Sequence, residues 1–197
     1  LQQMEEQKDI LRVQNGLEIK VCGIANTKKM VFDENGIQLS DWKNILTSSN
    51  ESSDPKLFVD RMISMNLANT IFIDNTADTQ IPDLYKKIFE ASISVATPNK
   101  IAASSVYDNY LSLKQLARKH NVEFLFETNV GAGLPVISTM RNLIHSGDRI
   151  IKIEAVLSGS VSFIFNNFDG TKPFSQLVNE AKELGYTEPD PRDDLSG

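Results

Sequence analysis

The residue best suited to chemistry is Lys100, which ends the segment Thr97-Pro98-Asn99-Lys100. Pro98 fixes the backbone just before it, and the preceding apolar run Ile93 to Ala96 predicts a β-strand. A lysine delivered by such a strand end can polarise a bound carbonyl or stabilise an alkoxide as it forms. A solvated loop lysine is the alternative, and this segment alone does not decide between them.

Two further predicted strands also end in small polar residues. Leu17 to Ala25 is followed by Asn26-Thr27, and Thr70 to Ile73 is followed by Asp74-Asn75-Thr76. In an open parallel sheet, ligands bind beyond the carboxyl ends of the strands. A polar loop is the ordinary explanation at any single strand end, but three such ends in one sheet favour a ligand crevice.

The residues after Ala25 also bear on the type of nucleotide. Folds that select NAD usually place Asp or Glu after the second strand, where the carboxylate binds the ribose hydroxyls. Here the corresponding residues are Asn26-Thr27-Lys28-Lys29, with no carboxylate and two cations. This pattern would accept a ribose 2′-phosphate and favours NADP over NAD, although surface lysines without any ligand are common.

Glu127 to Pro135 is a turn with two glycines spaced by one residue. It lacks the third glycine of a phosphate-binding fingerprint. Exposed carbonyls in such a turn, with the one carboxylate, could hold a monovalent or hard cation. From the residues alone, a purely structural turn is the favoured reading.

Tyr186 to Asp194 contains four carboxylates and one arginine, with prolines at positions 189 and 191. A residue before proline is held extended, so Glu188 and Asp190 have restricted directions. Fixed carboxylates suit the recognition of a substrate ammonium group. A solvated acidic loop after a helix that ends at Gly185 is the alternative.

The remaining reactive side chains favour structural roles. His120 and His145 fall near predicted helix C-termini, where the helix dipole stabilises an imidazolium. Cys22, the single cysteine, lies within an apolar predicted strand, which argues against a thiol nucleophile. A lone cysteine also cannot form an internal disulfide, so we expect a reducing compartment, the cytoplasm.

Strands alternate with helices over the first two thirds of the chain. We predict a short helix capped by Ser40 and a helix beginning at Asp54-Pro55, whose apolar stripe is Leu57, Phe58, Met62 and Met65. Further elements are a helix opened by Pro82, a helix over Val106 to Ala117, and a fourth strand over Val122 to Phe126. This alternation indicates an α/β fold with a parallel sheet and crossover helices.

The alternation of short strands and helices changes after Pro135. A helix over Pro135 to Ser146, closed by Gly147, precedes an alternating strand over Ile150 to Leu157 that suggests a second, mixed sheet. We therefore predict a change of domain near residues 130–135.

Composition excludes several classes of protein. The 197 residues include 20 Lys and Arg against 26 Asp and Glu, a net charge of −6, which argues against binding nucleic acid. No apolar run approaches the roughly 20 residues that cross a bilayer, so no membrane partner is expected. The first residue is Leu and the last segment ends without a tail, so both ends are expected to be cuts through a longer protein.

Several segments together resemble the homoserine dehydrogenases. They are Asp74-Asn75-Thr76, Thr97 to Lys100, Glu127 to Pro135, Leu157 to Ser160 with Phe163 to Asn166, and above all Gly185 to Gly197. The region Val21 to Asn26 looks most like the bifunctional aspartokinase/homoserine dehydrogenases. The likeness covers essentially the whole chain.

The resemblance implies an incomplete Rossmann-type dinucleotide-binding domain over residues 1–132 and the start of an α+β domain for substrate binding and dimerisation over 133–197. It also implies the NAD(P)H-dependent interconversion of L-aspartate 4-semialdehyde and L-homoserine, on the route to threonine and methionine. By position, Lys100, Glu188 and Asp194 would be catalytic, and Gly159 and Ser160 would line the amino-acid site with Glu188 and Asp194. The cofactor would lie along Asn26, Asn75, Thr76, Thr97, Pro98, Asn99 and Lys100. A sodium-type cation would bind Glu127 and the backbone of Val130, Ala132 and Leu134.

Two departures from the family pattern set further expectations. The Gly-rich phosphate loop and a second lysine of the family would lie outside residues 1–197, so this chain alone is expected to be nearly inactive. We expect a homo-oligomer and a small-molecule substrate, with the Lys100 amine facing Glu188 across the substrate pocket. A catalytically silent nucleotide-binding or oligomerisation module of the same fold is the alternative.

Overall fold

The protein is described by a computed structural model that covers residues 1–188 and 190–196. The chain divides into two compact units, Leu1–Phe126 and Glu127–Gly197. Among the described residues, no helix is long and apolar enough to span a membrane.

The first unit opens with helix α1 (Gln2–Asn15), the strands β1 (Gly23–Ala25) and β2 (Met30–Phe32), and α2 (Trp42–Ser48). It continues with α3 (Pro55–Met65), β3 (Ile71–Ile73), α4 (Tyr85–Glu90), β4 (Ser94–Ala96), α5 (Lys100–Ala103), α6 (Tyr107–Lys119) and β5 (Phe124–Leu125). Short 3-10 turns, η1 (Leu39–Asp41) and η2 (Ile81–Leu84), precede α2 and α4. From α3 to β5, strands alternate with helices as predicted, whereas β1 and β2 follow one another directly.

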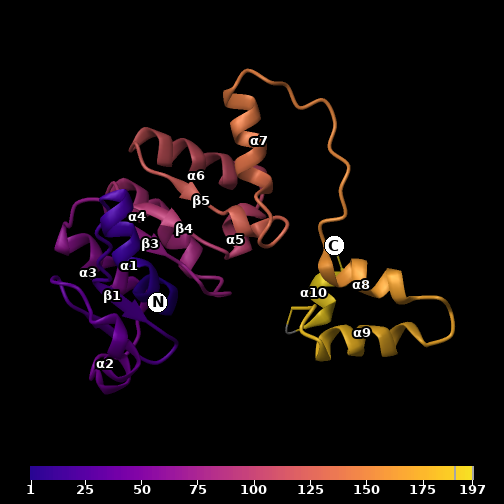
Figure 1. Cartoon of the computed structure of the whole chain (residues 1–197), viewed down its shortest axis with the longest axis horizontal. Helices are drawn as coiled ribbons and strands as arrows, with labels where there is room; N and C mark the ends of the chain where they lie inside the picture. Colours follow the sequence, from indigo (N-terminus) through magenta and orange to yellow (C-terminus); the bar gives the residue numbers. More distant parts are fainter. Residues whose placement is uncertain (189, 197) are drawn as a thin grey trace. The chain divides into compact units, whose positions relative to one another are not determined.

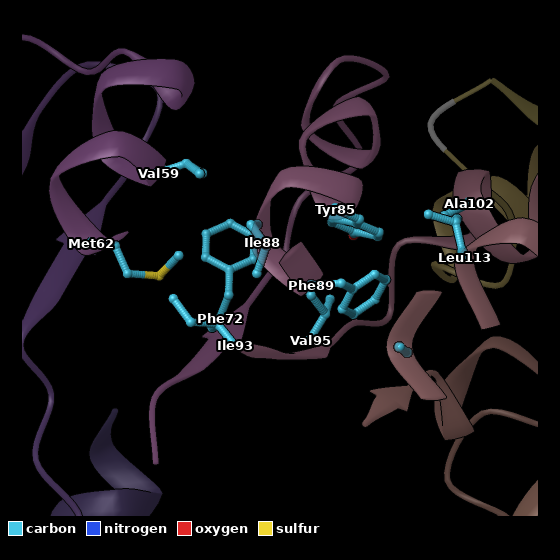
Figure 2. Close-up of a cluster of buried hydrophobic side chains, with 11 residues drawn as sticks. Val59, Met62, Phe72, Tyr85, Ile88, Phe89, Ile93, Val95, Ala102 and Leu113 are labelled. Atoms are coloured by element: carbon cyan, nitrogen blue, oxygen red, sulfur yellow. The ribbon is translucent and has the colours of Figure 1, made fainter. Parts of the chain in front are cut away.

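Strands β3, β4 and β5 form a parallel sheet in that order, which confirms the predicted α/β architecture. Figure 1 shows the three strands side by side with α4 and α6 next to them. Phe72 and Val95 point from the sheet into a core that α3, α4 and α6 cover. Figure 2 shows this cluster, in which Tyr85 and Phe89 project from α4 among the apolar side chains.

The predicted first strand differs from expectation. Only Gly23–Ala25 is a strand, and it pairs antiparallel with β2 in a separate two-stranded sheet. The hairpin packs on the rest of the unit through Phe32, whose ring centroid lies 4.6 Å from that of Phe58. A Cβ atom on Gly23 would lie 2.7 Å from the Phe32 ring, so this contact requires glycine. The three polar strand ends therefore do not share one sheet.

Helix starts follow the local signals in the sequence, with small differences. Oδ1 of Asp54 accepts hydrogen bonds from the backbone N–H groups of Lys56 and Leu57, 2.8 and 3.0 Å away, so the predicted start of α3 is confirmed. Ser40, by contrast, lies in a 3-10 turn, and α2 begins at Trp42. Leu57, expected in the apolar stripe of α3, is exposed, and Val59 is buried instead.

The second unit contains η3 (Glu127–Asn129), α7 (Val136–His145), α8 (Gly159–Asn167), α9 (Phe174–Glu183) and α10 (Pro191–Leu195). The predicted helix after Pro135 is confirmed. Gly185 follows α9 with a φ of 75°, as expected for a residue that ends a helix. Pro189 and Gly197 lie outside the described residues, so the expected stiffening at Pro189 stays a prediction.

The predicted strand over Ile150 to Leu157 is wrong. The segment has no regular secondary structure, and its apolar side chains are exposed, with Ile151 at 93%. A strand needs a neighbour for its backbone N–H and C=O groups, and no described segment of the unit pairs with this one. The alternation of apolar residues does not show whether a pairing strand is present. The domain boundary at 132/133 stays a prediction.

Candidate functional site

The ends of β3 and β4 lie next to each other in register, with Ile73 paired to Ala96. The N–H of Asp74 donates to the carbonyl of Ala96 (3.1 Å), and the hydroxyl of Thr97 donates to the carbonyl of Asp74 (2.9 Å). The exposed residues Asn75 and Thr76 follow one strand and Pro98 follows the other. The parallel sheet thus brings these predicted cofactor-binding residues to one edge.

Beneath that edge, Thr97 and Asn99 are buried, at 5% and 3% exposure. The amide Nδ2 of Asn99 donates to Oδ2 of Asp74 (3.1 Å) and to the carbonyl of Asp78 (3.0 Å). Its Oδ1 accepts the N–H of Ile101 (3.1 Å), so Asn99 also caps α5. The Asn99 side chain therefore ties the two strand ends together from below.

Lys100 is exposed and is the first residue of α5, which the sequence analysis had treated as part of a turn. A helix that begins at Lys100 and is capped by Asn99 fixes the backbone from which the ammonium group extends. The lysine is thus held at the same strand end as Thr97, as its position after β4 predicts.

Asn26 lies at the end of β1, in the separate hairpin. Its Oδ1 accepts the N–H groups of Lys28 and Lys29, both at 2.8 Å, which folds this polar loop back on itself. The ammonium group of Lys29 donates to the carbonyl of Ser49 at 2.5 Å, whereas Lys28 is exposed. The two lysines after the strand are therefore not equivalent.

Glu127 begins the turn expected to hold a cation. Its Oε2 accepts the N–H of Ser138 (2.8 Å), while Oε1 is buried and has no hydrogen-bond partner among the described residues. Gly131 and Ala132 have φ values of 75° and 51°, so both residues are in the left-handed conformation that allows a tight turn. No group of three His, Cys, Asp or Glu in the described chain could hold a metal ion, so any cation here would need backbone oxygens.

A second polar cluster forms in the unit that contains α8 and α10. The hydroxyl of Ser160, 2% exposed, donates to Oδ1 of Asp194 (2.9 Å), and Oδ2 of Asp194 accepts the N–H of Glu188 (2.7 Å). Gly159 is the first residue of α8, which Ser158 caps through its hydroxyl oxygen. The predicted substrate-binding residues Gly159, Ser160, Glu188 and Asp194 are thus gathered around one carboxylate.

Asp190 further organises the acidic segment Tyr186 to Asp194. Oδ1 of Asp190 accepts the N–H of Arg192 and caps α10, and the Arg192 guanidinium donates to both Asp190 oxygens. These hydrogen bonds from Arg192 hold the pKa of Asp190 at about 2, below its ordinary value of 3.8. The helix that presents Asp194 therefore starts from an ionised cap at neutral pH.

The side chains not assigned to chemistry keep their structural roles. His120 ends α6 and His145 is the last residue of α7, as predicted. Partial burial raises the pKa of the Cys22 thiol above its ordinary value of 9.0, so it stays protonated at neutral pH. This protonation is consistent with a thiol that is no nucleophile.

Sequence reasoning missed two residues of this site. The sequence pattern marks Asp74 only as part of a polar strand end and gives no role to Tyr85. Tyr85 is fully buried and its hydroxyl donates to Oδ2 of Asp74 at 2.6 Å. A tyrosine one turn after Pro82, on a buried helix face, needs a partner for its hydroxyl, which is the one signal that could have found it.

Comparison with known proteins accounts for this arrangement. The family profile of the homoserine dehydrogenase NAD binding domain matches residues 1–127, and that of homoserine dehydrogenase matches residues 135–197. The chain belongs to the homoserine dehydrogenase family. Both units of the structure thus have counterparts in this family, and the resemblance expected from the motifs is confirmed.

Curated members of the family are similar over the whole chain. The bifunctional aspartokinase/homoserine dehydrogenase 1, chloroplastic, of Arabidopsis thaliana is 42% identical over 198 residues, covering 100% of this chain and 22% of that protein. The homoserine dehydrogenase of Schizosaccharomyces pombe is 42% identical over 170 residues, covering 84% of this chain and 45% of that protein. The chain thus spans less than half the length of these homoserine dehydrogenases.

A solved homoserine dehydrogenase has the same fold. The hyperthermophilic archaeal homoserine dehydrogenase in complex with NADPH is 27% identical, with a TM-score of 0.77, over 98% of this chain and 59% of that one. The partial Rossmann-like architecture implied by the resemblance is therefore confirmed, and it is that of a homoserine dehydrogenase.

Proposed function

We propose that the native enzyme carrying this chain interconverts L-aspartate 4-semialdehyde and L-homoserine with NAD(P)H. The observation that carries the proposal is the Ser160–Asp194–Glu188 cluster, which gathers the predicted substrate-binding residues around one carboxylate in a chain of the homoserine dehydrogenase family. A silent module of the same fold would not need these groups at these positions.

Each proposed role follows from the chemistry of the group. Bound NAD(P)H supplies a hydride to C4 of the aldehyde. The Lys100 ammonium donates a hydrogen bond to the carbonyl oxygen, stabilises the alkoxide and passes a proton from solvent to it, which yields the alcohol. Asp194 holds Ser160 and the backbone of Glu188, and the exposed Glu188 carboxylate binds the substrate ammonium.

Lys100 belongs to the first unit and Glu188 to the second. The role proposed for Glu188 is to bind the ammonium group of the substrate. If it is right, Glu188→Gln raises the KM for the semialdehyde more than it lowers kcat, because it removes charge from a binding group rather than from the reacting carbonyl.

The test of the proposed function is Lys100→Ala in the native enzyme, followed by NADPH oxidation with L-aspartate 4-semialdehyde. We expect kcat to fall by at least about a hundredfold with unchanged secondary structure, because an alkoxide-stabilising cation is lost. Lys119→Ala, at an exposed lysine at the end of α6, is the matched control and should retain activity. Equal rates in both variants would refute the assignment.

For the cofactor, we propose that NADP is preferred and that Lys28 pairs with the ribose 2′-phosphate. Lys28 is exposed, whereas the Lys29 ammonium is engaged by the carbonyl of Ser49. Lys28→Ala should raise the KM for NADPH by about tenfold and leave the KM for NADH nearly unchanged. An equal effect on both cofactors would argue against a phosphate contact.

We also propose that a sodium-type cation binds at Glu127 and the backbone oxygens of Val130, Ala132 and Leu134. The buried Oε1 of Glu127 without a hydrogen-bond partner supports this, because a hard cation prefers such oxygens. Sodium should raise the thermal midpoint of the native enzyme, and Glu127→Gln should abolish that rise.

We also propose a cellular compartment and an oligomeric state for the native enzyme. The single Cys22 fits the reducing cytoplasm, although plant relatives are described as chloroplastic. The exposed apolar segment from Ile150 to Leu157 suits a partner surface, so we propose a homo-oligomer. Cell fractionation and the solution mass of the native enzyme test these two statements.

A further inference from the structure

A buried carboxylate joins the ends of β3 and β4 beneath the proposed cofactor site. Asp74 is 1% exposed, yet its two oxygens accept four hydrogen bonds from uncharged donors. Burying a carboxylate is costly, and a well-packed apolar residue would avoid the cost. The presence of Asp74 at this point in the core therefore calls for an explanation beyond packing.

The hydrogen bonds of Asp74 form a closed ring through the loop after β3. Its Oδ1 accepts the N–H and the hydroxyl of Thr76, at 2.9 and 2.7 Å, and the Thr76 hydroxyl oxygen accepts the N–H of Asp78 at 3.1 Å. Asn99 closes the ring, because its Nδ2 donates to both the carbonyl of Asp78 and Oδ2 of Asp74. Moving one member of the ring therefore displaces the others.

Tyr85 anchors the ring in the apolar core. It comes from α4, and its hydroxyl lies 2.6 Å from Oδ2 of Asp74 and 3.2 Å from the hydroxyl of Thr97. Its ring packs edge-on against Phe124, among the side chains of Figure 2. Burial and the Asp74 carboxylate raise the pKa of Tyr85 well above its ordinary value of 10.0, so the hydroxyl stays a donor at any physiological pH.

The ring is connected, through Asn99, to the backbone of the proposed catalytic lysine, Lys100. Asn99 is both a ring member and the residue whose Oδ1 caps α5, the helix that Lys100 begins. The orientation of the Asn99 amide is set by Asp74, since Nδ2 must face the carboxylate and Oδ1 must face Ile101. The backbone at Lys100 therefore depends on a carboxylate that is itself out of reach of solvent.

We propose that Asp74 and Tyr85 are positioning residues, which hold the β3 and β4 ends and the start of α5 in the arrangement needed for hydride transfer. The inference rests on the proposed function. Neither side chain would touch the substrate, because both are buried below the strand ends. Their effect would be on the geometry of the strand ends, and so on the hydride-transfer step more than on the affinity for cofactor.

The main test is Tyr85→Phe in the native enzyme, which deletes one hydroxyl and keeps the aromatic packing. Two controls separate positioning from stability: Ile88→Val, a buried neighbour on α4 outside the ring, and Tyr107→Phe, which removes an exposed hydroxyl. We expect kcat of Tyr85→Phe to fall by about tenfold or more, and the Kd for NADPH to rise by a smaller factor, because the ring also holds the proposed cofactor residues Thr76 and Asn99. Both controls should keep kcat, even where Ile88→Val lowers the thermal midpoint.

Asp74→Asn supplies a second variant. It keeps the shape but turns one acceptor oxygen into a donor, so the ring loses bonds on one side. We expect a larger loss of kcat than for Tyr85→Phe, and the double variant should lose less than the product of the two single losses, because both act on one ring.

Peptide-resolved hydrogen–deuterium exchange gives a readout that does not need turnover. Exchange in residues 74–79 and 97–103 should speed up by about tenfold in Tyr85→Phe and stay unchanged in Ile88→Val. No reduction of the semialdehyde by the wild-type enzyme would overturn the proposed function. Wild-type turnover with equal kcat in Tyr85→Phe and Ile88→Val, or unchanged exchange in both peptides, would overturn the positioning role.

Discussion

At the residue scale, the sequence identified the exposed side chains of the site better than the buried side chains that hold them in place. Lys100 and Thr76 follow strand ends, and a strand end can be recognised locally. Asp74 and Tyr85 are 11 residues apart, and their hydrogen bond exists only because α4 packs against β4, the strand next to β3 in the parallel sheet. Such a pair depends on tertiary structure and has no local signature.

The half-buried thiol of Cys22 allows a pH prediction at the same scale. Because burial raises the pKa of Cys22 above 9.0, the folded protein holds the thiol proton more tightly than the unfolded chain. Stability from this group is present below that pH and is lost as the pH rises through the folded pKa. The alkylation rate of Cys22 in the native enzyme should therefore reach half its maximum above pH 9.0, and a midpoint below that value would contradict the assignment.

At the element scale, helix starts were predictable where the cap and the first turn lie together in the sequence. Asp54-Pro55 begins α3 because the carboxylate accepts two N–H groups within three residues. The strand predicted over Ile150 to Leu157 did not form. A strand needs a neighbouring strand for its backbone hydrogen bonds, and the alternation of apolar residues does not show whether that neighbour is present. The expectation that the strand before Asn26 joins the parallel sheet was wrong for the same reason, because β1 pairs with β2 in a separate sheet.

The cap of α3 is open to direct measurement. Asp54→Ala should lower the free energy of unfolding by about 1 kcal/mol, since two N–H groups at the helix start lose their acceptor. Glu90→Ala removes an exposed carboxylate at the end of α4 and should change it by less than about 0.5 kcal/mol. Equal effects in chemical denaturation would show that Asp54 does not act as a cap.

At the scale of the whole molecule, the exposed apolar segment from Ile150 to Leu157 predicts assembly. Ile151 is 93% exposed and Val156 is 79% exposed, which is unusual for two apolar residues so close in the chain. Ile151→Lys should lower the mass of the native enzyme in sedimentation, because burying an unpaired cation in an interface is unfavourable. Val13→Lys, at an exposed position of α1, is the control.

The same sedimentation data would contradict the prediction in a simple way. If the wild-type enzyme and both variants sediment with the mass of a single copy, the apolar segment is not an interface between copies. The fold of each unit is unaffected by that outcome, since the cores around Phe89 and around Ile164 lie within their own units.

The central claim is that the native enzyme transfers a hydride to a four-carbon amino aldehyde. The most direct measurement uses NADPH that carries deuterium at both positions of the nicotinamide C4, with L-aspartate 4-semialdehyde and the native enzyme. Mass spectrometry should then find homoserine with a single deuterium at its C4. Homoserine without deuterium, or no homoserine at all, would contradict the account.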